Sequence, residues 1–98
     1  RSESRDGYAV RVLALHTTEG TSYTAAGLRD ATWWEGSSHA IIDENTLLTP
    51  AEGCVPYDRA SWTLRSGNRW SENAEIVAFA RYTRADWLAR PGRLDRLE

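Results

Sequence analysis

The stretch Val12–Gly20, VLALHTTEG, decides our interpretation of the fold, because an apolar run ends there on a histidine. The run begins at Tyr8 and reads YAVRVLAL as far as Leu15. It is nearly all apolar and includes β-branched valines, which is typical of a buried central strand. His16 then stands at the end of that strand. The sheet fixes the backbone there, and the loop over 16–22 leaves room for a ligand.

The next segments predict a helix and a hairpin. Residues 24–36 carry Ala, Leu and Trp at helical spacing. Thr21, Ser22 or Thr24 can cap the start of this helix, and Gly36 can end it. Residues 38–50 predict a hairpin, with SHAIID and TLLT as its strands and a turn at Glu44 and Asn45.

The second half of the chain predicts further strands and helices. We expect a loop over 51–60, a short strand over 61–64, a polar loop over 65–73 and a second buried strand over 74–82. Thr83 fits the N-cap of a helix that Pro91 and Gly92 end, and another helix is expected from Arg93 or Leu94. This order predicts an α/β class, a mixed sheet flanked by helices.

Length and composition limit the class of protein. The 98 residues suffice for a single domain, and 41% of them are hydrophobic, enough to fill a small core. The polar residues 1–7 are expected to fray. The net charge of −2 gives no basic excess for nucleic-acid binding. No run of about 18 apolar residues predicts a membrane span, and no signal peptide is visible.

Features at the two ends suggest a piece of a longer chain. Position 1 is not methionine, and the final residues GRLDRLE stop within a predicted helix. Cys54 is the only cysteine, so no internal disulfide can form.

Three polar residues in apolar surroundings are candidates for chemistry. His16 is either a metal ligand or general base, or a histidine that only bonds the backbone. His39 shares one strand face with Ile41 and Asp43, and a structural role is the simpler interpretation. Glu75 lies in the apolar run NAEIVAFA; it either faces solvent at the start of a strand or is a carboxylate near a metal.

Tryptophans near a polar loop are candidates for binding. Trp62 and Trp70 flank the glycine-containing loop RSGN and could form a wall against a sugar or a peptide. The alternative for each is that it simply fills the core.

Four segments in order resemble the type-2 N-acetylmuramoyl-L-alanine amidases, which share the peptidoglycan recognition protein fold. They are VLALHTTEG, SSHAIIDENTLLTP, SWTLRSGN and SENAEIVAFARYT, and they cover roughly residues 8–90. The chain is most similar to amidase domains of endolysins from bacteriophages of actinobacteria. The resemblance implies a zinc-dependent, bacteriolytic hydrolase that degrades the cell wall by splitting the amide between N-acetylmuramic acid and L-alanine in peptidoglycan.

The resemblance also implies roles for particular residues. His16 falls on a zinc ligand, and Glu75 falls on a glutamate that is catalytic in some members. Trp62 and Asn68 are expected to line the groove for the glycan or the stem peptide. Ser38 and His39, in the hairpin segment, are expected to contact substrate as well.

The chain departs from the family pattern in two places. Ser38 stands where many phage members have a catalytic tyrosine, so the resemblance favours Glu75 as the catalytic residue of this chain. No histidine follows His39, so the remaining zinc ligands are expected beyond Glu98, and residues 1–98 are interpreted as the N-terminal two-thirds of an amidase domain. Cys54 does not match the family's ligand cysteine.

Two other functions stay open. A domain of this fold that lacks zinc ligands can bind muropeptides without cutting them, and a small α/β domain of unrelated role would use His16 only as structure. The expected partners are bacterial peptidoglycan and, for the fragment, the C-terminal remainder of the domain or a dimer mate. A phage enzyme without a signal peptide would be made in the cytoplasm of the host bacterium and act on the wall after release.

Overall fold

The computed structural model describes residues 2–31, 34 and 36–97 and has a mixed α/β architecture, so the α/β class predicted from the sequence is confirmed. In chain order the elements are β1 (Ser2–Ser4), β2 (Val12–Thr17), α1 (Ala25–Asp30), β3 (Ala40–Ile42), β4 (Leu47–Leu48), the 3₁₀ turn η1 (Pro50–Glu52), β5 (Arg59–Ser61), the 3₁₀ turn η2 (Arg65–Trp70), β6 (Ser71–Ile76), α2 (Arg84–Leu88) and α3 (Pro91–Leu97).

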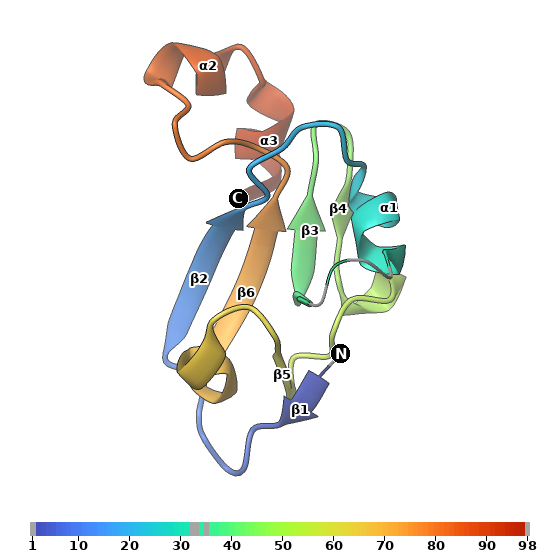
Figure 1. Ribbon diagram of the computed structural model, residues 1–98, viewed down its shortest axis with the longest axis vertical. Coiled ribbons are helices and arrows are strands. Elements are labelled where there is room, and N and C mark those ends of the chain that lie inside the picture. The colour runs from blue at the N-terminus through green and yellow to red at the C-terminus, as the bar shows by residue number, and fades with distance from the viewer. Residues whose placement is uncertain (1, 32–33, 35, 98) are drawn as a thin grey trace.

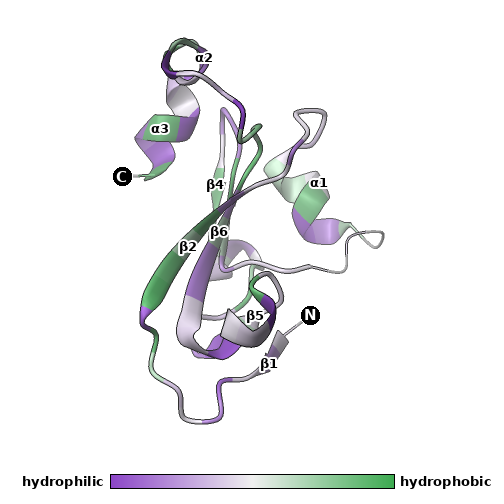
Figure 2. Ribbon diagram, turned by 60° about the vertical axis from the view of Figure 1, so that its left-hand side comes forward, coloured by the Kyte–Doolittle hydropathy of each residue, from purple (hydrophilic) through white to green (hydrophobic). Residues whose placement is uncertain are grey.

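The main sheet has the strand order β2-β6-β3-β4. β2, β6 and β3 run parallel, and β4 returns antiparallel to β3, which confirms the predicted hairpin. β1 and β5 form a separate antiparallel pair near the opposite end of the molecule from α2 and α3 (Figure 1). In the turned view α1 and α3 lie on opposite sides of the sheet (Figure 2).

The position of β2 corrects the prediction of a buried central strand. Among the described residues β2 pairs with β6 alone and is an edge strand of the sheet. Leu13 and Leu15 are 62% and 55% exposed, since no described element covers their side of β2. β6 holds the central position instead, between β2 and β3.

The other strand boundaries also differ from the prediction. β6 begins at Ser71, three residues before the predicted start, and β5 ends at Ser61, where the predicted strand begins. The N-terminal tail is not frayed as expected, because β1 pairs with β5 and Arg5 is buried. The Arg5 guanidinium donates to the carbonyl oxygens of Tyr57, Arg69 and Ser71 at 2.9–3.1 Å.

The helices are shorter than predicted, although two of the expected caps are present. Thr24 accepts a hydrogen bond from the Gly27 amide, and Thr83 and Asp86 form a reciprocal capping box. α1 ends at Asp30; Thr32, Trp33 and Glu35 of the predicted helix lie outside the described residues. α3 starts at Pro91 rather than after Gly92, since proline suits the first helical position.

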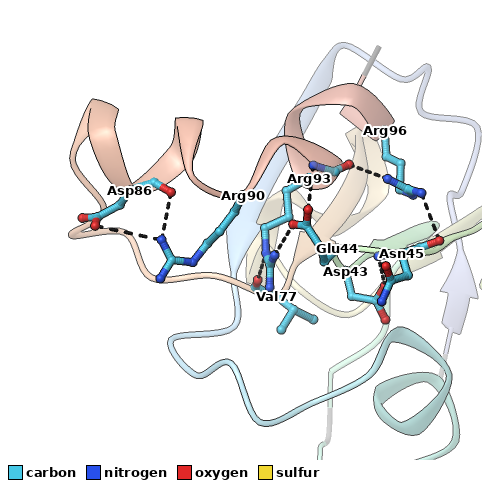
Figure 3. Close-up of polar contacts among 9 residues, drawn as sticks. Asp43, Glu44, Asn45, Val77, Asp86, Arg90, Arg93 and Arg96 are labelled. Carbon is cyan, nitrogen blue, oxygen red and sulfur yellow. Dashed lines mark hydrogen bonds and ion pairs between the residues drawn. The ribbon is translucent and has the colours of Figure 1, made fainter.

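Polar contacts with the β3–β4 turn hold α3 against the sheet (Figure 3). The Gly92 amide donates to Glu44 Oε1 at 2.9 Å, and Arg93 Nη1 donates to Glu44 Oε2 at 2.6 Å. Arg93 Nε also donates to the carbonyl oxygen of Val77, just after β6. These contacts tie α3 to both β6 and the hairpin.

A small apolar core lies between α1 and the sheet. Its buried members are Ala25, Leu28, Ile41, Leu48 and Cys54, and Trp34 packs against them. The candidate site lies on this same face of the sheet.

Candidate functional site

The register of the parallel strands places His16 beside Glu75. His16 of β2 is the partner of Glu75 of β6, and Glu75 is in turn the partner of Ile41 of β3. Registered residues of parallel strands carry their side chains on the same face, and neighbouring strands are about 4.8 Å apart. Ile41 packs against α1, so the His16–Glu75 pair shares the α1 side of the sheet.

Polar residues continue along this face of β6. Ser71, Asn73 and Glu75 alternate on it, and all three are buried. The Asn73 amide nitrogen Nδ2 donates to the hydroxyls of Ser61 and Ser71, at 2.8 and 3.1 Å. Asn73 Oδ1 therefore faces His16 Nε2, 3.2 Å away, and accepts a hydrogen bond from it. In neutral His16 this leaves the lone pair on Nδ1, the nitrogen that could bind a cation.

Glu75 faces a small hollow in the protein. The hollow measures about 60 Å³ and is lined by Glu75 together with Thr18, Tyr23, Leu28 and Trp34. Burial raises the pKa of the Glu75 carboxyl, and the nearby His16 offsets part of this rise. A buried carboxyl with a raised pKa can both accept and donate a proton, which is what general acid–base chemistry requires.

His39 and Ser38 lie in the interior, with exposed fractions of 0% and 3%, so the structure places neither where a substrate can reach it freely. His39 Nδ1 accepts from the Asn73 amide, and its Nε2 donates to the Arg59 carbonyl oxygen. Burial, with the Arg5 guanidinium 3.1 Å away, lowers the pKa of His39. The Ser38 hydroxyl contacts the backbone carbonyl oxygens of Ala40 and Asn73.

Trp62 and Asn68 do lie together, in an open groove. The groove is also lined by Gly36, Thr63 and Arg65. Trp62 is 44% exposed, so its ring is available to a ligand. Asn68 Oδ1 accepts from the amides of Thr63 and Leu64, at 3.2 and 2.7 Å, and so shapes the turn before η2.

Shared residues connect the groove to the Glu75 hollow. A third hollow, lined in part by Ser38, Ile41 and Cys54, also touches Trp34 and Gly36. Trp34 is common to this hollow and the Glu75 hollow, and Gly36 is common to it and the Trp62 groove. Each of the three concavities therefore shares one lining residue with its neighbour.

The described residues do not form a complete metal site. Over residues 2–31, 34 and 36–97, no three His, Cys, Asp or Glu side chains are placed to hold one ion. His16 and Glu75 are two metal-capable groups, whereas a catalytic zinc needs three protein ligands. Cys54 belongs to the apolar core, where burial raises its pKa to about 11.

Sequence reasoning missed Asn73 and Arg65. The signal for Asn73 was the alternation Ser71-x-Asn73-x-Glu75, which predicts one polar strand face if the strand begins at Ser71. Arg65 carried no local signal, because its place beside Trp62 depends on the turn that Asn68 holds.

Comparison with known proteins returns no match to the chain from any family model, any curated protein or any solved structure. In the part of the chain that the structure describes, no helix has the length and apolarity needed to cross a membrane.

Proposed function

We propose that this chain acts on bacterial peptidoglycan as part of an N-acetylmuramoyl-L-alanine amidase of the endolysin type. The observation that carries the proposal is the His16–Glu75 pair, side by side at the carboxyl ends of two parallel strands. Sites in α/β sheets form at this end of the strands. The resemblance of four sequence segments to type-2 amidases supports the same function.

The residues present suit hydrolysis of an amide. Glu75 would take a proton from a water molecule as that water's oxygen bonds to the carbonyl carbon of the muramyl lactyl group. It would then return the proton to the nitrogen of L-alanine as the C–N bond breaks. The products are a free lactyl carboxyl group and a peptide with a free amino terminus. Asn73 would hold the His16 ring in one orientation through Nε2.

Zinc belongs to the proposal through the resemblance alone. His16 Nδ1 and the Glu75 carboxylate offer two donors among the described residues, which is fewer than a catalytic zinc requires. This donor set does not fit a complete zinc centre.

The incomplete donor set favours a second candidate, a peptidoglycan-binding module that does not cut. Such a module needs only the groove with its exposed Trp62. The two candidates share a ligand and differ in whether Glu75 performs chemistry.

One experiment separates them. The chain, with and without added zinc, is incubated with purified actinobacterial cell walls, and newly freed alanine amino groups are measured by labelling and mass spectrometry. An amidase releases them, and Glu75→Gln lowers the rate by about 10²–10⁴-fold. Glu72→Gln, on the opposite face of β6, is the matched control. Binding to the walls without release of amino groups supports the binding module. If the chain neither binds the walls nor releases amino groups, both candidates are refuted.

A further inference from the structure

Arg65 stands in the Trp62 groove in an unusual backbone conformation. Its φ angle is +51°, in the left-handed region that residues with a side chain rarely occupy. Such conformations persist where the surrounding structure enforces them, and they concentrate at functional sites. Here the side-chain oxygen Oδ1 of Asn68 enforces the turn by accepting hydrogen bonds from the backbone amides of Thr63 and Leu64.

The Arg65 guanidinium is left available at the groove. Arg65 is exposed, and among the described residues no ion pair or hydrogen bond engages its side chain. Most other arginines of this chain are engaged: Arg5, Arg29, Arg69, Arg90, Arg93 and Arg96 contact carbonyl or carboxylate oxygens. Arg65 therefore brings an unengaged cation to the groove beside Trp62.

The groove offers hydrogen-bond donors and an aromatic surface. Asn68 uses its oxygen in the turn, so its Nδ2 group remains to donate. Arg65 adds a planar guanidinium that can bind both oxygens of a carboxylate. Trp62 adds an exposed ring. The described lining residues include no Asp or Glu, so the charge of the lining is positive.

We infer that Arg65 is a specificity-determining residue that binds the α-carboxylate of the D-glutamate residue of a muramyl peptide, with Trp62 packing against the same ligand. The inference rests on the proposed function for the identity of the ligand. The position of the groove is compatible with it, because the groove shares Gly36 with the hollow lined by Ser38 and Cys54, which in turn shares Trp34 with the Glu75 hollow.

The test compares two muramyl dipeptides that differ in one group. N-acetylmuramyl-L-alanyl-D-glutamate carries a free carboxylate where the isoglutamine form carries an amide. Their affinities are measured by titration calorimetry in the Glu75→Gln background, which prevents turnover. We expect the acid to bind roughly tenfold or more tightly than the amide. Arg65→Asn should remove this preference while leaving the amide form's affinity within about twofold.

Two further variants separate the loss of the Arg65 charge from a change in the fold. Asparagine and glycine both tolerate a positive φ, so Arg65→Asn and Arg65→Gly remove the charge without straining the turn. Arg84→Asn, an exposed arginine of α2 at the opposite end of the molecule, is the matched control and should retain the preference (Figure 1). Equal binding of the two ligands by the parent protein, or a preference that survives in Arg65→Asn, overturns the inference alone. If the parent protein binds neither ligand, the proposed function is refuted and the inference with it.

Discussion

Glu75 is the residue on which the account depends most. It is a carboxyl group that is 8% exposed, in a hollow with apolar and aromatic neighbours. No hydrogen bond to its carboxylate is present among the described residues, so burial is not fully compensated. A residue with this environment is more useful for chemistry than for stability.

Replacing Glu75 by glutamine should stabilise the fold in a pH-dependent way. Because the folded-state pKa of Glu75 is raised, its ionisation above that pKa opposes folding, and this cost is absent below the ordinary value of 4.5. Glu75→Gln should therefore raise the melting temperature at pH 7, and the gain should shrink as the pH falls through the raised folded-state pKa and be absent below about 4.5. Glu72→Gln is the control, measured by thermal unfolding across the same pH range. If the increase in melting temperature caused by Glu75→Gln is the same at every pH, the raised pKa of Glu75 is contradicted.

Cys54 should react slowly while the chain is folded. Its thiol is 7% exposed, and burial raises its pKa from 9.0 to about 11. At pH 8 the thiolate fraction falls roughly a hundredfold relative to an unperturbed thiol. Iodoacetamide labelling followed by mass spectrometry should therefore be at least that much slower in buffer than in denaturant. Labelling at equal rates in both would show that the core is not formed.

Residue-level prediction succeeded where a residue type stood out from its surroundings. His16 after an apolar run and Glu75 within one were visible in the sequence, and the structure brings them together. His39 looked similar, but pairing across β3 and β6 buries it completely. Sequence distinguishes a polar residue in apolar surroundings, whereas only the fold decides whether solvent reaches it.

At the scale of elements, α3 shows how one small segment is held. Its first turn meets the β3–β4 turn so closely that a Cβ on Gly92 would lie 2.0 Å from the Glu44 carbonyl oxygen. The close approach lets the Gly92 amide and the Arg93 guanidinium bond the two oxygens of one carboxylate (Figure 3).

Gly92→Ala should therefore displace α3. We expect the loss of both contacts with Glu44 and a fall in the free energy of unfolding of about 2 kcal/mol, measured by urea denaturation. Arg93→Met removes the charged contact and keeps the apolar stem, and Arg84→Met on α2 is the exposed control. If Gly92→Ala unfolds at the same urea concentration as the parent, α3 is not held by this contact.

Element types were easier to predict than element ends and neighbours. The hairpin with its turn at Glu44 and the caps Thr24 and Thr83 follow from local rules, and the structure has all of them. The position of β2 at the sheet edge does not follow from local rules, because a strand can have the same apolar sequence whether it pairs with one neighbouring strand or with two. The early start of β6 depends likewise on pairing with β2 from Ser71 onward.

At the scale of the whole molecule, β2 leaves an apolar edge open. The strand VLALHT contains no acidic residue, lysine, arginine or proline, and most of its ribbon has the green of hydrophobic residues (Figure 2). Its leucines Leu13 and Leu15 are exposed. Protein edges of this kind are prone to pair with other chains unless a charge interrupts them.

The isolated chain should therefore self-associate as its concentration rises. Leu13→Lys places a charge on the edge and should shift the sedimentation velocity profile toward monomer. Leu88→Lys, at a leucine of α2 that is 55% exposed, is the matched control and should leave association unchanged. Equal association by the parent and Leu13→Lys would show that the edge is not the contact.

The central claim is that muropeptides bind the α1 side of the sheet, from Glu75 to Trp62. The most direct measurement is an NMR titration of the ¹⁵N-labelled chain with N-acetylmuramyl-L-alanyl-D-isoglutamine. The account predicts saturable shifts in the Trp62 indole and in the amides around His16 and Glu75, with none at Leu88 on α2. Shifts confined to the β2 edge, or no shifts at millimolar ligand, would contradict it.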